Sequence, residues 1–483
     1  MRLNPLFISL FRLSLAGSCW FGLRVMAEEV RPNILFVYTD DQSYDALSVV
    51  QREQGKLGRF PWLKTPNLDQ MAADGVRFRN AFVVNSICSP SRAVNLTGRY
   101  NHLNGIASNF RPFPTDSVTQ ATLLRDAGYK TAYVGKWHMG GQRERPGFDH
   151  HATYVAHGRY QDAPFIVDGR KTESHGWVDD VATDYAIDFI HGQRGKTQPW
   201  LLMLGYKTPH QPWEPPARAS DLYEGEKSGR PPNWASPPPY FERDPRPSDG
   251  LGRSWNNLNY FRCVTAMDDS FGKLMAALEH SGQVDGTVVI FTSDNGMYLG
   301  AHATGDKRSA YEESMRVPFM VRDPRLPAST RGRVVDEMVL NLDLAPSVLE
   351  MAGVAVPPEM QGRSWRGLLE GTVADWRQSW FYEYFTESQR QTRVPDITAV
   401  RTNEAKLIKY VGFPEWTELF DLTRDPHEMN NLYHDPVAAD LRDRLLAEHD
   451  RLTETLGFRV PDYVDRPDDW GTPGSLAGDL SKR

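Results

Sequence analysis

The segment "NILFVYTDD" (residues 33–41) sets the pattern on which the expected fold depends. Its first seven residues are a β-rich, mostly apolar run, which is typical of a strand buried on both faces. Three further runs repeat the pattern at residues 131–134, 200–204 and 287–293, and helical patterns lie between them. This alternation predicts an α/β fold with a large, mostly parallel sheet sandwiched between helices.

Polar and charged side chains follow each of these four runs at the point where the expected strand ends. Ligands of parallel sheets bind beyond the carboxyl ends of the strands, so we expect these side chains to meet at one rim. An aspartate pair after one strand more often caps a turn, but the same pattern after four strands indicates a shared site. The residues concerned are Asp40, Asp41, Lys136, His138, Lys207, His210, Asp294 and Asn295.

Some of these side chains offer oxygen ligands for a metal ion. Carboxylates with an amide favour a hard cation, Ca²⁺ or Mg²⁺, and the sequence has no cluster of cysteine and histidine that would indicate zinc. The predicted metal ligands are Asp40, Asp41, Asp294 and Asn295. Nearby cations, Arg92, Lys136 and Lys307, would turn the net charge of the site positive and attract an anion.

Cys88 lies in the segment "SICSPSRAVNLTG" (residues 86–98), which has the pattern of a loop that enters a helix. Cys88 and Arg92 are four residues apart and therefore share a helical face, and the positive end of the helix dipole adds to the arginine charge. This setting predicts a reactive thiolate. A hard cation held by carboxylates, however, favours an oxygen nucleophile over sulfur. The site thus requires oxygen at a position where the gene encodes cysteine.

The residues around Cys88 resemble the signature of formylglycine-dependent sulfatases, C-x-P-S-R-x-x-x-L-T-G, of the alkaline-phosphatase-like superfamily. Here the signature reads Cys88-Ser-Pro-Ser-Arg92, followed by "LTG" at residues 96–98. The resemblance covers nearly all of the chain after the N-terminal segment. Further motifs in the family's order are Asp40-Asp41, "GKWH" (135–138), "PH" (209–210), "DNG" (294–296), Lys307 before "YEESMRVP" (311–318), and "LFDLTRDPHEMNNL" (419–432).

The resemblance implies a chemistry for the expected site. In the family the cysteine is oxidised after translation to formylglycine (3-oxoalanine), so Cys88 would be modified and would bind Ca²⁺ with the four oxygen ligands. One hydroxyl of the aldehyde hydrate attacks sulfur, and proton loss from the other then expels sulfate. The implied roles are stabilisation of the hydrate by Arg92 and Lys136, contact with the sulfate by Lys136, His210 and Lys307, protonation of the leaving oxygen by His210 and Lys307, and removal of the hydrate proton by His138.

A carbohydrate sulfate ester is the expected substrate. Expected export, long loops and an aromatic content of 11% favour a sugar over a small aryl sulfate. Residues 158–169 and the C-terminal segments resemble sulfatases of glycosaminoglycans, which makes 6-O-sulfated N-acetylglucosamine the first expectation. Trp213 and Trp416 are candidates for stacking on the sugar. Lys207 could equally be a member of the site or a surface lysine. His302 could equally be a member of the site or a structural histidine.

Two alternative functions stay open. A phosphonate monoester or phosphodiester hydrolase of the same superfamily has a similar fold and can share the formylglycine. A catalytically inactive, calcium-dependent glycan-binding protein would keep the metal ligands without turnover. A net charge of -7 with a pI of about 6.0 argues against binding to nucleic acid.

Residues 1–27 have the pattern of an export signal, with Arg2 and Arg12, a short apolar core and Ala27 at the end. The apolar run is too short to span a bilayer, and no later segment predicts a transmembrane helix. Cys19 is an alternative site for a lipid anchor. We expect a periplasmic or secreted protein that depends on a formylglycine-generating or sulfatase-maturating enzyme.

The remaining chain divides into an expected catalytic domain (residues 28–371) and a smaller α+β subdomain (residues 372–483) with an antiparallel sheet. The subdomain ends in a helix that Asp435 should cap and Gly457 should stop. Ten prolines within residues 212–247 exclude long regular structure, and the tryptophans and tyrosines of this segment favour an ordered loop over the rim rather than a disordered insert. Once the signal is removed, two cysteines remain, which excludes a disulfide scaffold. A single Cys88–Cys263 bridge stays open, although Cys263 lies in a helical pattern.

Overall fold

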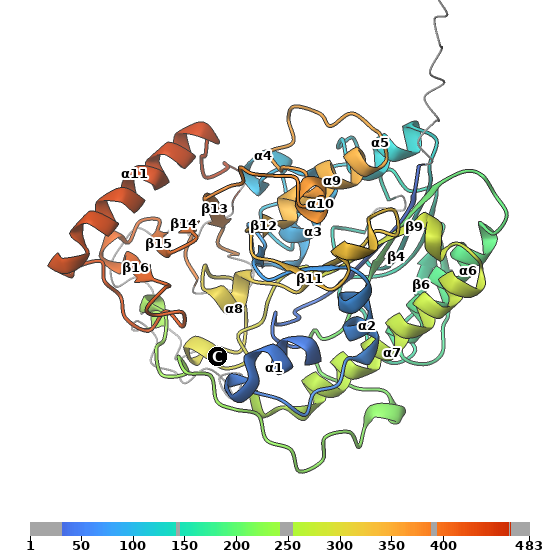
Figure 1. Ribbon diagram of the computed structural model, residues 1–483, viewed down its shortest axis with the longest axis horizontal. Helices are drawn as coiled ribbons and strands as arrows, with labels where there is room; N and C mark the ends of the chain where they lie inside the picture. The colour runs from blue at the N-terminus through green and yellow to red at the C-terminus, as the bar shows by residue number, and fades with distance from the viewer. Residues whose placement is uncertain (1–30, 142–144, 242–254, 388–393, 463, 465–483) are drawn as a thin grey trace, which may run out of the picture. The chain divides into compact units, whose positions relative to one another are not determined.

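The first quoted segment forms strand β1 (Asn33–Thr39) at the centre of a ten-stranded sheet. The computed structural model of the protein describes residues 31–141, 145–241, 255–387, 394–462 and 464. The expected export signal and Cys19 lie outside these ranges. The predicted α/β architecture is confirmed, with helices on both faces of the sheet (Figure 1).

The core of the sheet is parallel, as the four apolar runs predict. Strand β1 pairs in parallel with β8 and β9, and β4 pairs in parallel with β8 and β5. The antiparallel partners lie toward the two edges. The order across the sheet is β11 (Arg333–Val335), β2 (Val76–Phe78), β10 (Phe319–Arg322), β9 (Thr287–Ser293), β1, β8 (Trp200–Gly205), β4 (Lys130–Lys136), β5 (His150–Tyr154), β6 (Phe165–Val167) and β7 (Arg170–Thr172).

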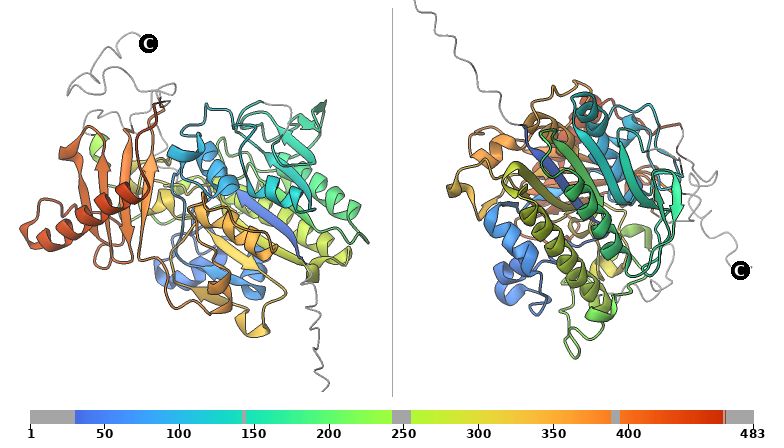
Figure 2. Two further views of the ribbon diagram at one scale, coloured as in Figure 1. Left: turned by 90° about the horizontal axis from the view of Figure 1, so that it is seen from above. Right: turned by 90° about the vertical axis from the view of Figure 1, so that its right-hand side faces the viewer.

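Two layers of helices bury the faces of this sheet because the strands are apolar on both sides. The long helices α6 and α7 run side by side across one face (Figure 2). That face is covered by α1 (Ser48–Gln54), α2 (Pro66–Asp74), α6 (Val178–Gly192) and α7 (Leu258–His280). The opposite face is covered by α3 (Cys88–Thr97), α5 (Gln120–Asp126), α9 (Leu344–Met351) and α10 (Arg366–Glu370).

The C-terminal segments form the predicted antiparallel sheet, and helix α11 (Ala439–Thr455) packs against it (Figure 2). Asp435 caps a 3₁₀ turn (Pro436–Ala438) directly before this helix, since its side chain accepts a hydrogen bond from Val437 N, and α11 itself begins at Ala439. The apolar residues of the C-terminal sheet share one core with those around α3, and this core includes Phe82 and Trp380. The strands are β13 (Ser379–Tyr384), β14 (Ile397–Thr402), β15 (Ala405–Tyr410) and β16 (Glu418–Asp421).

Short elements connect these layers. They are the strand pair β3 (Ala81–Phe82) and β12 (Val339–Leu340), and the single-turn helices α4 (Asn101–Asn104) and α8 (Glu312–Met315). No helix among the described residues is both long and apolar enough to cross a membrane.

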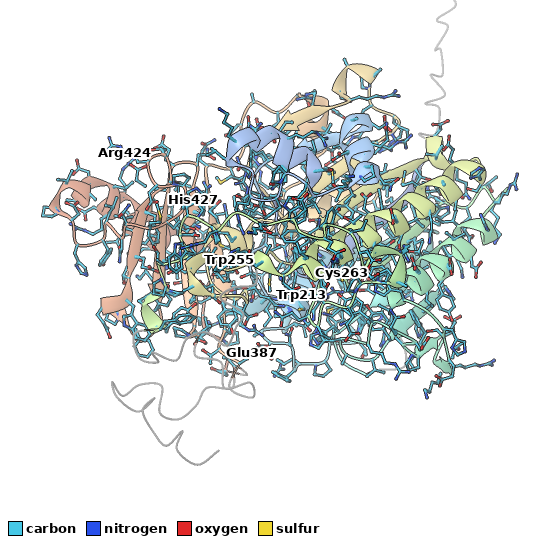
Figure 3. All side chains as sticks on the ribbon, turned by 90° about the horizontal axis from the view of Figure 1, so that it is seen from below. Trp213, Trp255, Cys263, Glu387, Arg424 and His427 are labelled. Atoms are coloured by element: carbon cyan, nitrogen blue, oxygen red, sulfur yellow. The ribbon has the colours of Figure 1, made fainter. Side chains whose placement is uncertain are left out.

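The two cysteines of the described chain lie in different places. Cys263 is buried in α7, where it packs in the same apolar cluster as Trp213 (Figure 3). Cys88 is the first residue of α3 on the other face of the sheet. Both are free thiols, so the bridge that the sequence left open is not formed.

Candidate active site

The predicted residues meet at one rim because the carboxyl ends of β1, β4, β8 and β9 lie next to one another. Ligand oxygens of Asp40, Asp41 and Asp294 lie within 4.8 Å of one another, and all three side chains are buried. Asp41 has a φ of 69°, a left-handed conformation that non-glycine residues rarely adopt and that recurs at functional sites. We call these aspartates, together with Asn295, the rim cluster.

Cys88 points into the rim cluster from the start of α3. Its thiol donates a hydrogen bond to Asp40 Oδ1 at 3.4 Å, and Lys136 Nζ lies 3.8 Å from the sulfur. Burial, followed by the charge of Asp40, raises the pKa of the thiol to about 12. The expectation of a reactive thiolate is therefore wrong, because burial and the carboxylate outweigh the helix dipole and the cations.

Arg92, one helical turn after Cys88, is fixed by hydrogen bonds and by an ion pair with Asp294. Nε and Nη2 lie 2.8 and 2.7 Å from Asp294 Oδ2, and Nη1 donates to Lys136 O at 2.5 Å. A glycine makes this approach feasible, since a Cβ on Gly205 would lie 2.9 Å from Lys136 O and 3.1 Å from Arg92 Nη1. The glycine at the end of β8 thus lets the arginine reach between β8 and β4.

Two buried lysines neutralise the carboxylates of the rim cluster. Lys136 Nζ contacts Asp40 Oδ2, and Lys307 Nζ lies 2.5 and 2.6 Å from the two carboxylate oxygens of Asp41. Burial alone would raise the pKa of Asp40, but Lys136 and other cations hold it well below its usual range. Burial opposes the charge on Lys307, but Asp41 raises its pKa, so this ammonium stays charged.

The donor set fits a hard divalent cation. Asn295 Oδ1 is buried without a hydrogen-bond partner among the described residues, while Asn295 Nδ2 donates to Asp41 Oδ1 at 2.7 Å. Burial and then the charge of Asp40 raise the pKa of Asp294 to about 7. An amide oxygen without a donor, beside carboxylates that repel one another, is an arrangement that Ca²⁺ or Mg²⁺ would relieve.

His138 and His210 are both neutral and carry the proton on Nδ1. His210 Nδ1 lies 2.6 Å from Gln211 O, which can only accept, and its Nε2 lies 3.8 Å from Asp41 Oδ2. Ser89 Oγ donates to His138 O at 2.5 Å, so it can only accept from His138 Nδ1 at 3.3 Å. Burial, assisted by nearby lysines, lowers the pKa of each ring well below its usual value. Each ring therefore has an acceptor nitrogen at Nε2.

His157 is a member of the site that the sequence analysis missed. It follows β5, and its ring centroid lies 4.0 Å from that of His138 and 4.4 Å from that of His210. The strand-end rule would have found it if residues 150–154 had been recognised as a strand next to β4. Lys207, which the sequence left between a site and a surface role, is fully buried and donates to His157 O at 3.0 Å.

His302 does not belong to the rim cluster. Its Nε2 accepts from Asn233 Nδ2 at 2.9 Å, and its Nδ1 donates to Ser236 O at 2.9 Å, so it holds the described part of the proline-rich segment. It lies in a second buried group, the junction cluster, at the contact with the C-terminal sheet, where Figure 3 labels the neighbouring His427. The junction cluster consists of Asn233, His302, Glu312, Glu313, Lys406 and Glu428.

The two tryptophans considered for sugar stacking have other contacts. Trp416 is 8% exposed and stacks on Phe413 at 4.2 Å in the shared apolar core. The expectation for Trp416 is therefore wrong, because its ring is buried. Trp213 is half-buried, donates from Nε1 to Pro209 O at 2.7 Å and packs edge-on against Tyr260.

Comparison with known proteins places this geometry in a family. The profile of the sulfatase family matches residues 32–354, and that of the C-terminal part of N-sulphoglucosamine sulphohydrolase matches residues 300–455. The chain is 34% identical to an N-acetylglucosamine-6-O-sulfatase of Bacteroides thetaiotaomicron over 510 residues, which covers 90% of this chain and 88% of that protein.

Two solved structures extend the comparison. A protein in complex with its substrate D-glucosamine-2-N,6-O-disulfate superposes with a TM-score of 0.81 and 29% identity, covering 90% of this chain and 100% of that chain. A phosphonate monoester hydrolase from Silicibacter pomeroyi superposes with a TM-score of 0.71 over 88% of this chain and 95% of that one. Its identity of 24% shows a shared fold alone. By its sequence, its fold and the residues at its rim, this chain belongs to the sulfatase family of the alkaline-phosphatase-like superfamily.

Proposed function

We propose that this sulfatase removes O-sulfate from a sulfated carbohydrate, with 6-O-sulfated N-acetylglucosamine as the first substrate to test. The support comes from the two relatives above, one named for N-acetylglucosamine-6-O-sulfate and one bound to a 6-O-sulfated glucosamine. The alternative of a phosphonate or phosphodiester hydrolase rests on a likeness of fold.

The observation that carries the proposal is the charge balance around Cys88. The carboxylates of Asp40, Asp41 and Asp294 are matched by Arg92, Lys136 and Lys307, all buried within one group of contacts. A divalent cation bound there would leave a surplus of two positive charges. Buried surplus charge is unfavourable unless it is paired, so the loaded site favours an anion such as a sulfate ester.

We assign the metal to Asp40, Asp41, Asp294 and Asn295, with residue 88 as a further ligand, and propose Ca²⁺ as the ion. We further propose that Cys88 is converted to formylglycine by a maturating enzyme. When present, the hydrated aldehyde supplies an oxygen nucleophile whose charge Ca²⁺ stabilises. The pKa of about 12 for the unmodified thiol supports this reading, because such a thiol is a poor nucleophile at neutral pH.

The cations of the chain would then bind and orient the sulfate group. Lys136 and Lys307 carry ammonium groups on two different aspartates of the rim cluster, and Arg92 is held by hydrogen bonds to Asp294 and Lys136 O, so none of them must reorganise as charge develops. His138 presents a neutral Nε2 that can accept a proton. His210 must first gain a proton before it can protonate the leaving oxygen, and the negative charge of the ester would raise its pKa.

Peptide mass spectrometry of the segment that contains residues 86–92 tests the modification directly. After co-expression with a sulfatase-maturating enzyme, the expected result is a peptide in which an aldehyde replaces the thiol of Cys88. Cys263 serves as the internal control, because it is a buried helix residue without a proposed chemical role. An unmodified Cys88 in a protein that hydrolyses sulfate esters would contradict the proposed nucleophile.

Hydrolysis of N-acetylglucosamine 6-sulfate, compared with a matched phosphodiester and with other sulfated sugars, tests the reaction. We expect turnover of the sulfate ester and a loss of about 10⁵-fold or more in kcat in Cys88→Ala, since removal of a nucleophile has effects of this size. The variant Cys263→Ala should retain activity. A preference for the phosphodiester would favour the hydrolase alternative, and calcium-dependent glycan binding without turnover would favour the inactive binding protein.

Export is proposed on the pattern of residues 1–27. Cell fractionation of the producing organism tests it, with the mature N-terminus near residue 28 as the expected result.

A further inference from the structure

The third histidine of the rim lies between the two that the family motif predicts. The ring of His157 is stacked on His210 at an interplanar angle of 30° and tilted by 48° against His138. It is half-buried in the turn that follows β5. Its position beside both rings raises the question of what it contributes to the arrangement.

The protonation state of His157 follows from its partner. Lys136 Nζ lies 3.1 Å from His157 Nδ1, and an ammonium group can only donate. Nδ1 must therefore carry the lone pair, which places the proton of the neutral ring on Nε2. His157 is thus the opposite tautomer of His138 and His210. Burial, followed by the charge of Lys136, lowers its pKa far below the usual range, in agreement with a neutral ring.

The turn that carries His157 is tied to the loop after β8 at two points. Lys207 Nζ donates to His157 O at 3.0 Å and lies 4.7 Å from the centre of the Tyr160 ring. Tyr160 OH in turn donates to His210 O at 2.7 Å. These two hydrogen bonds fix the backbones of His157 and His210 relative to each other. The stacked arrangement of the two rings is therefore held by contacts of both residues.

Lys136 has three neighbours that determine where its ammonium lies. They are Asp40 Oδ2, the sulfur of Cys88 at 3.8 Å and His157 Nδ1 at 3.1 Å. Asp40 pulls the ammonium toward the metal ligands, and His157 is the acceptor outside the rim cluster. Without that acceptor the ammonium of Lys136 would keep only its contacts with Asp40 and residue 88.

We propose that His157 is a positioning residue for sulfate binding, whose Nδ1 lone pair holds the ammonium of Lys136 in place. This inference rests on the proposed function, because it assumes that Lys136 contacts the sulfate. It adds to the site a neutral acceptor that faces the ammonium of a lysine.

Three substitutions separate positioning from packing. Asparagine places an acceptor oxygen at the same number of bonds from the backbone as His157 Nδ1, glutamine places it one bond further, and alanine has none. We expect His157→Ala and His157→Gln to lower kcat/KM by about 10²-fold, since a misplaced group near the reacting atoms has effects of this size, and His157→Asn to recover most of that loss. The exposed His175, with 93% of its side chain accessible, provides the control His175→Ala.

A second measurement does not require hydrolysis. In the Cys88→Ala protein labelled with ¹⁵N-histidine, NMR should show His157 as the neutral tautomer protonated on Nε2. Titration of that protein with inorganic sulfate should show weaker binding when His157→Ala is added and restored binding with His157→Asn. A matured wild type without sulfatase activity would refute the proposed function, while the tautomer and sulfate binding would still test His157. A ring protonated on Nδ1, or His157→Asn as impaired as His157→Ala, would overturn the inference.

Discussion

The rim cluster and the junction cluster are similar as sets of ligands but differ in their surroundings. Each brings three metal-ligating side chains within 4.8 Å of one another. The rim cluster lies beside His210, whose side chain is 15% exposed, and is built from the ends of several strands. In the junction cluster His302 is 1% exposed and Lys406 is fully buried. At the junction the side chains of Glu312 and Glu313 are 11% and 10% exposed, so access differs less between the two clusters than charge does.

The junction cluster is closed by its own side chains. Asn233 Nδ2 donates to His302 Nε2 and to Glu313 Oε1, both at 2.9 Å. Lys406 Nζ bridges Glu312 and Glu428 at 2.9 and 2.6 Å. The amide group and the ammonium thus occupy the positions from which a metal ion would reach the carboxylates.

Charge separates the two clusters further. At the junction Glu312 pairs with Lys406 and Arg401, and Glu428 pairs with Lys406, whereas Glu313 lies beside His302, so three glutamates share two paired cations. Burial, assisted by the charge of Glu312, raises the pKa of Glu428 to about 8, so a proton there neutralises the group at pH 7. The carboxylates and cations of the rim already balance, and a divalent ion makes that site an anion receptor. Charge, rather than the list of ligands, therefore distinguishes the two clusters.

Lys406→Met should produce the largest effect on stability. Removal of one partner from a buried ionic network leaves uncompensated charge, so we expect the free energy of unfolding to fall by about 3–5 kcal/mol. Urea denaturation followed by circular dichroism measures this, and kcat per folded molecule should stay unchanged. If kcat falls while the protein remains folded, the two clusters are coupled and the distinction drawn here fails.

Calcium binding should give the next largest effect, and only through the rim cluster. At about 100 times its Kd, Ca²⁺ should raise the free energy of unfolding by about 2.7 kcal/mol, since it binds the folded state alone. A chelator should reverse the gain, Asp294→Asn should abolish it, and Lys406→Met should preserve it. The same titration with Mg²⁺ tests the choice of ion. A full response to Ca²⁺ in Asp294→Asn would contradict the assigned ligands.

Measured over one pH unit, the contribution of Glu428 at the junction to the pH dependence of stability should be the smallest of the three effects. Between pH 5 and 8 folded Glu428 keeps a proton that the unfolded chain has released, because its pKa is about 8 against an ordinary value of 4.5. Stability should therefore fall as pH rises through this window, by at most about 1.4 kcal/mol per pH unit for one proton. Glu428→Gln should flatten the profile relative to the exposed control Glu337→Gln. An unchanged slope would show that Glu428 is ionised when folded.

The sequence was sufficient for the elements whose signal is local. Residues 33–39 and 287–293 were predicted as strands and form β1 and β9 with the same bounds. The helix within residues 86–98 and the cap at Asp435, which in the structure begins the 3₁₀ turn before α11, were also predicted from local signals. Apolar runs, caps and motif spacing depend on neighbours along the chain, so they can be predicted without knowledge of the tertiary contacts.

Tertiary structure alone decided which strand ends are neighbours and how deeply each group is buried. The strand before His157 begins with two histidines and lacks a continuous apolar run, so its position beside β4 could not be predicted from the sequence. For the same reason His157 was not predicted as a member of the site. The thiolate expected at Cys88 failed for a related reason, since the pKa depends on burial and on Asp40, which is 48 residues away in the chain. The sequence determined which chemical groups the site contains and the family to which it belongs. Only the fold determined the desolvation and the cross-strand distances that set their protonation and their roles.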